Sequence, residues 1–273
     1  SYYRMRDGRP VWGEVRSGGA QAAAADISGK PIPLQSSFFD VRGNVVRTWS
    51  DGDTTSTIGP AGAWFLPPTT TPFDDAALAA WLLRQPQRLA PTVPSATARV
   101  EIAAETTVNV GGRSVPLRLA AILGIHLAPR VVWLDDTGAF FATNAGWFIT
   151  VRRGAEGALP TLRELELQWL EKRDAAIASQ FAPAAAPAVV IQNGDLFDSE
   201  SGVVRPRTTV VIQGDRITAV GPAASTRGPA GATIIDATGK TIIPGMWDMH
   251  THAFQGSPDG QLQLAAGITT VRD

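Results

Sequence analysis

The sequence contains no cysteine and only 3 histidines. Without cysteine it has no disulfide framework, no thiolate metal site and no cysteine nucleophile. Any metal ion that the chain holds must therefore be bound by His, Asp, Glu or a modified Lys. Because histidine is so scarce, the place of each one matters for the search for a site.

The sequence also lacks an excess of charge and a long apolar run. Its 24 basic and 25 acidic residues leave a formal net charge of -1, and no dense basic segment marks a nucleic-acid or anionic-membrane partner. No apolar segment reaches the ~20 residues that a membrane-spanning helix needs. With 44% hydrophobic residues in 273, the chain has material for one to three cored domains.

Because the sequence has no cysteine, cysteine usage does not indicate whether the protein lies in an oxidising or a reducing compartment. The sequence starts at Ser1, inside what reads as a strand. We expect that processing or trimming removed an earlier N-terminus. A periplasmic or secreted bacterial protein is our prediction, with the cytoplasm as the alternative.

The first part of the chain, residues 1–158, predicts an antiparallel β-rich extension. Alternating residues 99–110 and 114–122 flank Gly111-Gly112, a strong hairpin signal, and 130–134 and 139–143 flank a second turn. One helix interrupts this pattern, with Asp74 or Asp75 as its N-cap and Ala77, Leu78, Trp81 and Leu82 on one face.

Three further segments follow. Residues 159–187 predict a helix that begins near Pro160, with Leu162, Leu165, Trp169, Ile177 and Phe181 near one stripe, and then an Ala/Pro linker from Ala182. Residues 188–243 contain short regular strands, expected to form part of a small β-sandwich. Residues 244–273 open with Pro244-Gly245 and an apolar strand, as a strand that enters a catalytic barrel would.

The candidate metal ligands are His250 and His252, with Asp248 beside them. Alternate side chains of a strand point to the same face, so all three share one face while Trp247 and Met249 face a helix layer. Two imidazoles can then converge on one ion. Asp248 lies one step deeper, and we expect a buried, hydrogen-bonded carboxylate that supports the site without being a ligand. A bare His-x-His pair also occurs by chance, as a surface or core feature.

The order of several motifs resembles the amidohydrolase superfamily, in its branch of imidazolonepropionases and prolidase-like enzymes. The resemblance covers about residues 188–273. It is carried by Asn193-Gly194 with Asp198, by residues 214–217 with Val220-Gly221, by the segment 236–252 and by the segment 265–273.

The resemblance implies a fold and a mechanism. It implies a β-sandwich and a (β/α)8 TIM barrel, with His250 and His252 at the end of barrel strand 1 and the Gly267-Ile268-Thr269-Thr270 segment in strand 2. It implies one or two divalent metal ions, zinc first, held also by a carboxylated Lys or a Glu, two further His and an Asp. The reaction is hydrolysis of a small amide or dipeptide-like substrate by a metal-activated hydroxide, with a carboxylate that shuttles the proton.

The remaining ligands and six of the eight barrel strands would have to come from elsewhere. We expect that the polypeptide continues beyond Asp273 or that a second chain supplies the remainder. Two imidazoles alone would hold a metal ion too weakly for catalysis. Residues 1–273 alone are therefore expected to be inactive and to aggregate through unpaired strands.

Other polar residues receive structural interpretations. Asp136-Thr137-Gly138 matches the triplet of aspartic proteases, but those need two such loops, so a hairpin turn is preferred. His126 is read as a hydrogen-bonded structural residue, and Glu101 and Glu105 as solvated strand positions. Asp273 is read as a chain-end or supporting residue near the barrel mouth.

Two other functions remain open at this stage. The β-rich extension, residues 1–158, could bind an apolar ligand or a protein partner, with residues 1–273 having no catalytic role of their own. The extension could also serve as the interface of a homo-oligomer. Measurement of bound metal in the complete protein distinguishes the hydrolase hypothesis from these two alternatives.

Overall fold

The computed structural model describes residues 2–17, 35–42, 44–50, 53–66, 71–94, 96–145, 148–181, 186–252 and 259–273. The chain is mainly β, as predicted, and it divides into two compact units, with the boundary in the sequence between Arg173 and Asp174. This boundary lies within helix α2, Leu159–Phe181. The finer division into four segments stays a prediction, and residues 182–185 of the expected linker lie outside the described part.

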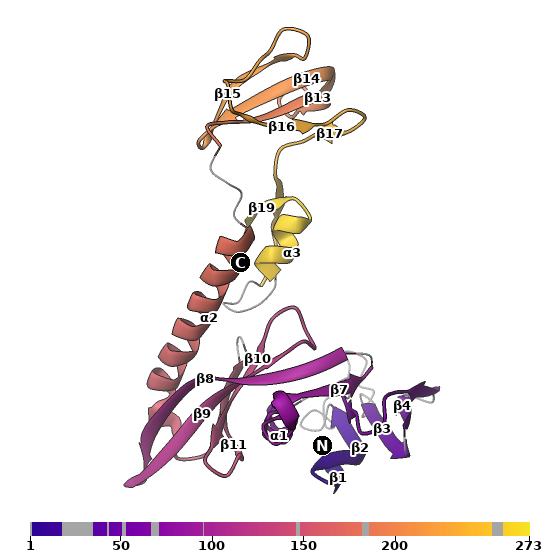
Figure 1. Cartoon of the computed structure of the whole chain (residues 1–273), viewed down its shortest axis with the longest axis vertical. Helices are drawn as coiled ribbons and strands as arrows, with labels where there is room; N and C mark the ends of the chain where they lie inside the picture. Colours follow the sequence, from indigo (N-terminus) through magenta and orange to yellow (C-terminus); the bar gives the residue numbers. More distant parts are fainter. Residues whose placement is uncertain are drawn as a thin grey trace, which may run out of the picture. The chain divides into compact units, whose positions relative to one another are not determined.

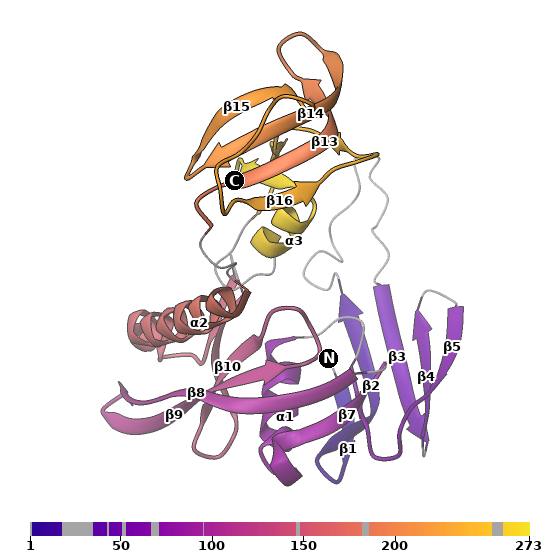
Figure 2. The ribbon, with the colours of Figure 1, turned by 45° about the horizontal axis from the view of Figure 1, so that its top comes forward.

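The first unit begins with a five-stranded antiparallel meander (Figure 2). Its strands lie in sequence order, each antiparallel to the next. The turn after the first strand takes positive φ at Asp7 and Gly8, 52° and 72°. The strands are β1 (Tyr2–Arg6), β2 (Arg9–Ser17), β3 (Gln35–Arg42), β4 (Val45–Ser50) and β5 (Asp53–Ile58).

The first unit also contains a seven-stranded sheet, in the order β12-β11-β10-β9-β8-β7-β6. The predicted hairpin at Gly111-Gly112 is confirmed: both glycines have positive φ, 58° and 79°, and Asn109 Oδ1 accepts a hydrogen bond from the Gly112 amide. The strands are β6 (Trp64–Phe65), β7 (Leu89–Val93), β8 (Ala96–Val110), β9 (Arg113–Leu123), β10 (Arg130–Asp135), β11 (Phe140–Ala145) and β12 (Phe148–Val151).

Helix α1, Pro72–Leu82, packs against this sheet (Figure 1). Leu78, Trp81 and Leu82 are buried in the largest core cluster, as the periodicity predicts. The predicted N-cap is wrong: Thr71 is the cap, and the Asp74 carboxylate accepts a hydrogen bond from the Thr71 amide. Pro72 fits the first helical position, so the helix starts three residues earlier than an Asp cap would allow.

Helix α2 contributes its first turns to a second core cluster, which contains Leu117, Leu119, Trp133 and Phe141. The residues of α2 that are buried are Leu162, Glu166 and Leu170, four apart, whereas the predicted stripe placed Leu165 and Trp169 beside Leu162. The side chain of Phe181, the last residue of that stripe, lies outside the described part. The observed buried stripe includes the carboxylate of Glu166, which a search for apolar residues does not detect.

The second unit opens with a sheet in the order β15-β14-β13-β16, with β17 also paired to β13. Both short strands run parallel to β13, and the tight turn at Gly214 is confirmed. Val203, Ile217, Val220 and Ile234 remain exposed, so this sheet is one layer of the expected sandwich. The strands are β13 (Val189–Asp198), β14 (Val203–Gln213), β15 (Arg216–Pro222), β16 (Thr233–Asp236) and β17 (Thr241–Ile242).

The second unit ends with a β-α-β arrangement. Strand β18, Met246–Asp248, pairs in parallel with β19, Ile268–Val271, and helix α3, Asp259–Ala265, lies between them in sequence. Within residues 186–252 and 259–273, these are the only strands of this small sheet, so the barrel stays a prediction. Among the described residues, no helix combines the length and apolar character needed to cross a membrane.

Candidate metal centre

The two candidate histidines lie just past the carboxyl end of β18. The strand ends at Asp248, so the prediction that all three residues continue one strand is wrong. Backbone hydrogen bonds still tie this segment to the neighbouring strand: Arg272 donates to the Asp248 carbonyl at 2.9 Å, and Thr251 donates to the Arg272 carbonyl at 3.2 Å. The site is therefore built where two parallel strands end, the position at which α/β folds place catalytic groups.

The close approach of the two strands depends on Gly245. A Cβ atom at this position would lie 2.1 Å from Thr269 Oγ1 and 2.9 Å from Thr269 Cβ. Rotation of the threonine side chain cannot relieve a clash with its own Cβ. The Pro-Gly turn before β18 thus leaves room for β19.

The His250 and His252 rings face each other edge to face, with centroids 5.2 Å apart and an interplanar angle of 87°. Two imidazoles bound to one tetrahedral zinc at Zn–N distances of ~2.1 Å have ring centroids roughly 5 Å apart. The spacing of this pair fits a shared ion. Both residues are accessible, with the His252 side chain 46% exposed.

A carboxylate lies beside the second histidine. Asp273 Oδ1 is 3.5 Å from His252 Nδ1, a long contact that links the end of β19 to the loop after β18. Histidines that bind metals commonly hold the ring nitrogen that is not a ligand against a carboxylate. This arrangement matches the supporting role predicted for Asp273 and leaves Nε2 of His252 as the ligand candidate.

Asp248 is hydrogen-bonded, as predicted, but it is only partly buried. Its Oδ1 accepts a hydrogen bond from the backbone amide of His250 at 3.0 Å. Trp247 and Met249, expected beneath a helix layer, are 69% and 55% exposed. Within the described residues, the Asp248 carboxylate therefore fixes the backbone conformation at His250.

The described residues fit a partial metal site. They contain no group of three or more His, Asp, Glu or Cys side chains placed to hold one ion. Two imidazoles are suitable donors for zinc and similar ions, but a catalytic zinc has three protein ligands. His250 and His252 are therefore two ligands of a set that these residues do not complete.

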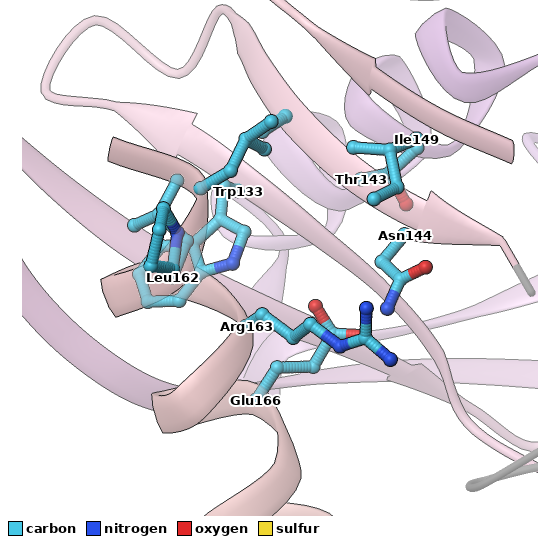
Figure 3. Close-up of a pocket in the computed structure, with 10 residues that line it drawn as sticks. Trp133, Thr143, Asn144, Ile149, Leu162, Arg163 and Glu166 are labelled. Carbon is cyan, nitrogen blue, oxygen red and sulfur yellow. The ribbon is translucent and has the colours of Figure 1, made fainter. Parts of the chain in front are cut away.

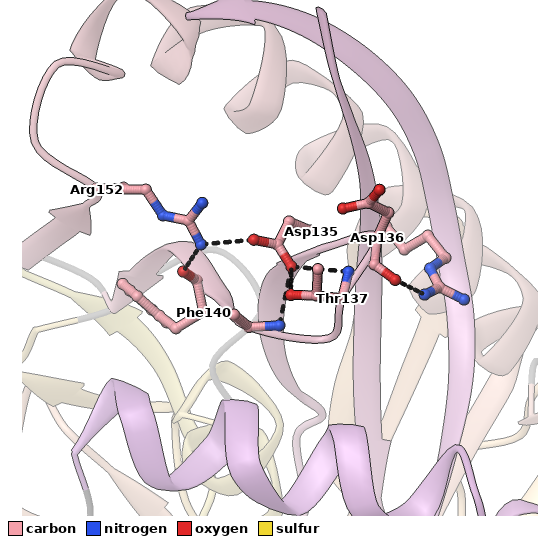
Figure 4. A network of polar contacts seen from close by, with 7 residues as sticks. Asp135, Asp136, Thr137, Phe140 and Arg152 are labelled. Atoms are coloured by element: carbon pink, nitrogen blue, oxygen red, sulfur yellow. Dashed lines mark hydrogen bonds and ion pairs between the residues drawn. The ribbon is translucent and has the colours of Figure 1, made fainter.

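The Asp136-Thr137-Gly138 triplet forms the hairpin turn between β10 and β11, as preferred on the sequence (Figure 4). The carboxylate that organises the turn belongs to Asp135. Its Oδ1 accepts hydrogen bonds from the Thr137 amide, the Thr137 hydroxyl and the Ala139 amide, at 3.0, 2.6 and 3.0 Å. Asp136 is exposed. The aspartic-protease interpretation has no support here.

The other polar candidates lie in the first unit. His126 is exposed, and its hydrogen-bonded structural role stays a prediction. Desolvation and then the charge of Arg130 lower its pKa. Glu105 is exposed and Glu101 is half-buried beside Arg99 at 3.1 Å, as expected of residues at a wet strand face.

Sequence reasoning missed a group of polar side chains in the first unit. Trp133, Asn144 and Glu166 line a cavity between β10–β12 and the start of α2 (Figure 3). A signal was present in the sequence, because Glu166 lies four residues after Leu162 and four before Leu170 on one helical face. A single carboxylate on an otherwise apolar stripe marks a buried charge.

No family model matches the chain. An adenine deaminase of Rubrobacter xylanophilus is 46% identical over 65 residues, 23% of this chain and 11% of that protein. An adenine deaminase of Chelativorans sp. is 37% identical over 94 residues, 34% of this chain and 16% of that protein. The chain thus spans a small part of the curated relatives it matches.

Among solved structures, molinate hydrolase is 29% identical to the matched part, with a TM-score of 0.28, covering 33% of this chain and 24% of that chain. This likeness is too partial to bear on the fold. Adenine deaminases are members of the amidohydrolase superfamily. The matched part of this chain is thereby shown to resemble the amidohydrolase superfamily, as its motifs predicted.

Proposed function

We propose that this chain carries the first metal ligands of a hydrolase that cleaves a carbon–nitrogen bond. The pairing of His250 and His252, with ring centroids 5.2 Å apart at the end of two parallel strands, carries this proposal. The complete site would contain one or two divalent ions, with zinc the first candidate. The two imidazoles would bind one of these ions. The rest of the same polypeptide or a second chain would supply the other ligands.

Each residue of the site has a defined task in this proposal. A divalent ion held by His250 and His252 would act as a Lewis acid and would lower the pKa of a bound water molecule to about 7. His252 is oriented by Asp273, and the backbone of His250 is fixed by the Asp248 carboxylate. Gln263 of α3 donates a 2.7 Å hydrogen bond to the Thr251 hydroxyl and so steadies the residue between the two histidines.

The proposal leaves two substrate classes to distinguish. The motifs predict an amide or dipeptide-like substrate, whereas the named relatives are adenine deaminases. Both reactions are hydrolyses of a carbon–nitrogen bond by an activated water molecule. A panel that contains adenine, acyl-amino acids and dipeptides separates the two classes by the product released. Homo-oligomer formation and a periplasmic or secreted location stay predictions.

The test uses the complete protein with His250→Ala, His252→Ala and the control His126→Ala. We expect both site variants to lose bound metal and turnover while their circular dichroism stays unchanged. The control should keep wild-type metal content, because His126 belongs to the other unit. The measurements are metal per chain by mass spectrometry and turnover on the panel. Wild-type metal and turnover in either site variant would refute the proposal.

Asp248 is tested by two substitutions. Asp248→Ala removes the acceptor for the His250 amide, and we expect metal affinity or turnover to fall by about 10- to 100-fold. Asp248→Asn keeps an oxygen acceptor without the charge, so its loss should be smaller. An Asp248→Ala enzyme with unchanged kinetics and metal content places Asp248 outside the site.

A further inference from the structure

The first unit contains a cavity of about 210 Å³ between β10–β12 and the start of α2 (Figure 3). Its lining is mostly apolar and includes Ala142, Ile149 and Leu162. An apolar cavity of about 150 Å³ is large enough to hold benzene. The space is therefore sufficient for one six-membered ring with a short substituent.

The wall of this cavity contains a buried carboxylate, that of Glu166. This residue is 4% exposed, and its carboxylate points from α2 toward the strands on the other side of the cavity (Figure 3). No hydrogen bond or ion pair to it is found among the described residues. The unpaired side-chain atoms of the described residues that are closed off completely are Thr92 Oγ1, Trp133 Nε1 and Asn144 Oδ1, and the Glu166 oxygens are not among them. A molecule in the cavity can therefore reach the Glu166 carboxylate.

The surroundings of Glu166 leave its charge without compensation. Desolvation raises the pKa of Glu166 to about 7 against the opposing charge of Arg163. Arg163 is exposed, so water screens its charge. The facing strands contribute no titratable side chain to the wall, since their residues there are Trp133, Ala142, Thr143, Asn144 and Ile149.

A ligand can supply the missing charge. An anion would be repelled by the ionised carboxylate, and a neutral molecule would leave the desolvation of the charge in place. An ammonium group would replace the lost hydration with a charge-assisted hydrogen bond, the stronger kind in a site closed to water. The cavity thus combines space for an apolar body with an acceptor for a cationic head.

We propose that this cavity binds a small primary amine with an apolar body of about one ring. The ammonium group donates a hydrogen bond to the Glu166 carboxylate, and the ring lies against Ile149 and Leu162. This proposal is independent of the metal centre, since every residue that lines the cavity belongs to the first unit.

The probe is benzylamine, which carries an ammonium group at pH 8, as the lysine side chain does. Its controls are benzyl alcohol, which matches it in size without a charge, and benzoate, which carries the opposite charge. Binding to the complete protein is measured by NMR titration. We expect a benzylamine Kd of about 1 mM or tighter at pH 8, and at least about tenfold tighter than that of either control. Absence of benzylamine binding, or tighter binding of a control, overturns the proposal.

The pH dependence of binding tests the role of the carboxylate. A group with a pKa of about 7 is roughly one-tenth ionised at pH 6 and roughly nine-tenths ionised at pH 8. Because the ammonium group pairs with the ionised form, we expect benzylamine to bind about tenfold more tightly at pH 8 than at pH 6. Benzyl alcohol should show no such increase. A benzylamine affinity that is constant over this range contradicts the pairing.

Variants place the binding at this cavity and separate charge from shape. Glu166→Gln removes the charge and nearly keeps the shape, so it should weaken benzylamine at least about tenfold and leave benzyl alcohol unchanged. Glu164→Gln makes the same change at an exposed position of the same helix and should keep the wild-type Kd. Ile149→Trp adds bulk at a lining residue that is 45% exposed and should abolish binding of both probes without loss of the fold. Benzylamine binding that is equal in Glu166→Gln and Glu164→Gln, or that survives Ile149→Trp, overturns the assignment.

Discussion

Asp135 shows how one side chain fixes a local structure. It is 7% exposed, and its carboxylate accepts hydrogen bonds from the turn and from Arg152, whose Nη2 lies 2.8 Å from Oδ2. Desolvation alone would raise the pKa of this carboxyl. The hydrogen bonds from Thr137, Arg152 and Ala139 and the charge of Arg152 outweigh it, so the pKa is lowered. The ionised form therefore stabilises the folded protein.

Asp135→Ala is expected to lower the free energy of unfolding by about 1–3 kcal/mol at pH 7, because several donors lose their acceptor. The matched change Asp136→Ala should alter it by no more than ~0.5 kcal/mol. A lowered pKa means that the contribution of Asp135 is present above the ordinary Asp value and is lost as the pH falls through the folded-state value. Urea unfolding at pH 7 and pH 3 tests both; equal losses for the two variants would contradict this role.

Gly245 permits another local structure, the close approach of β18 and β19. Gly245→Ala should lower the free energy of unfolding by about 1–3 kcal/mol and reduce metal content, since the added Cβ meets Thr269. Gly260→Ala in α3 is the control, because its Cβ meets nothing within 4 Å and alanine favours a helix. Thermal unfolding and metal analysis compare the two. A Gly245→Ala protein as stable and as metal-loaded as the control argues against the packing described.

Secondary-structure elements whose conformation is determined by neighbouring residues were predictable from the sequence. The hairpin at Gly111-Gly112 follows from two residues with positive φ, and the start of α2 follows from Pro160. Pairings between distant segments were not predictable, such as β13 with β16, because no local signal names the partner strand. The same limit applies to the metal centre. Its histidine pair is a local motif, whereas the contact of His252 with Asp273 spans 21 residues.

Helix α2 shows what periodicity leaves out, since its buried Glu166 determines part of its stability. The folded-state pKa of about 7 lies above the ordinary Glu value, so the folded protein retains a proton that the unfolded chain has released. Stability from this group is greatest below about pH 4.5 and is lost as the pH rises toward 7.

Glu166→Gln should remove this pH dependence. At pH 8 the variant is expected to be more stable than the wild type by about 1–3 kcal/mol, and near pH 4 the two should be similar. The exposed control Glu164→Gln should follow the wild type at every pH. Urea unfolding midpoints between pH 4 and pH 8 give the comparison. A constant difference across this range would show that Glu166 is not a buried titrating group.

At the scale of the whole molecule, the described apolar core is uneven. All three core clusters consist of residues between Phe39 and Leu162, which belong to the first unit. The second unit instead exposes Val204, Ile217 and Ile243, each 50% or more accessible. Exposed apolar strand faces and open edges favour association between molecules. We therefore expect the first unit to fold by itself. A fragment that contains this unit must include the first turns of α2, because Leu162 belongs to its core.

Residues 1–173 should form a monomer that unfolds cooperatively, whereas residues 1–158 should be less stable and residues 1–273 more prone to aggregate. Truncation at 158 removes Leu162, which is 2% exposed, and uncovers Trp133 and Phe141 of the same cluster. Loss of a buried leucine costs about 2–5 kcal/mol, so the shorter fragment should lose at least this much of its free energy of unfolding. Light scattering and urea unfolding of the three fragments provide the comparison. Equal midpoints for 1–158 and 1–173 would show that α2 is not part of the first core, and a monodisperse 1–273 would show that the apolar strand faces of the second unit do not drive association.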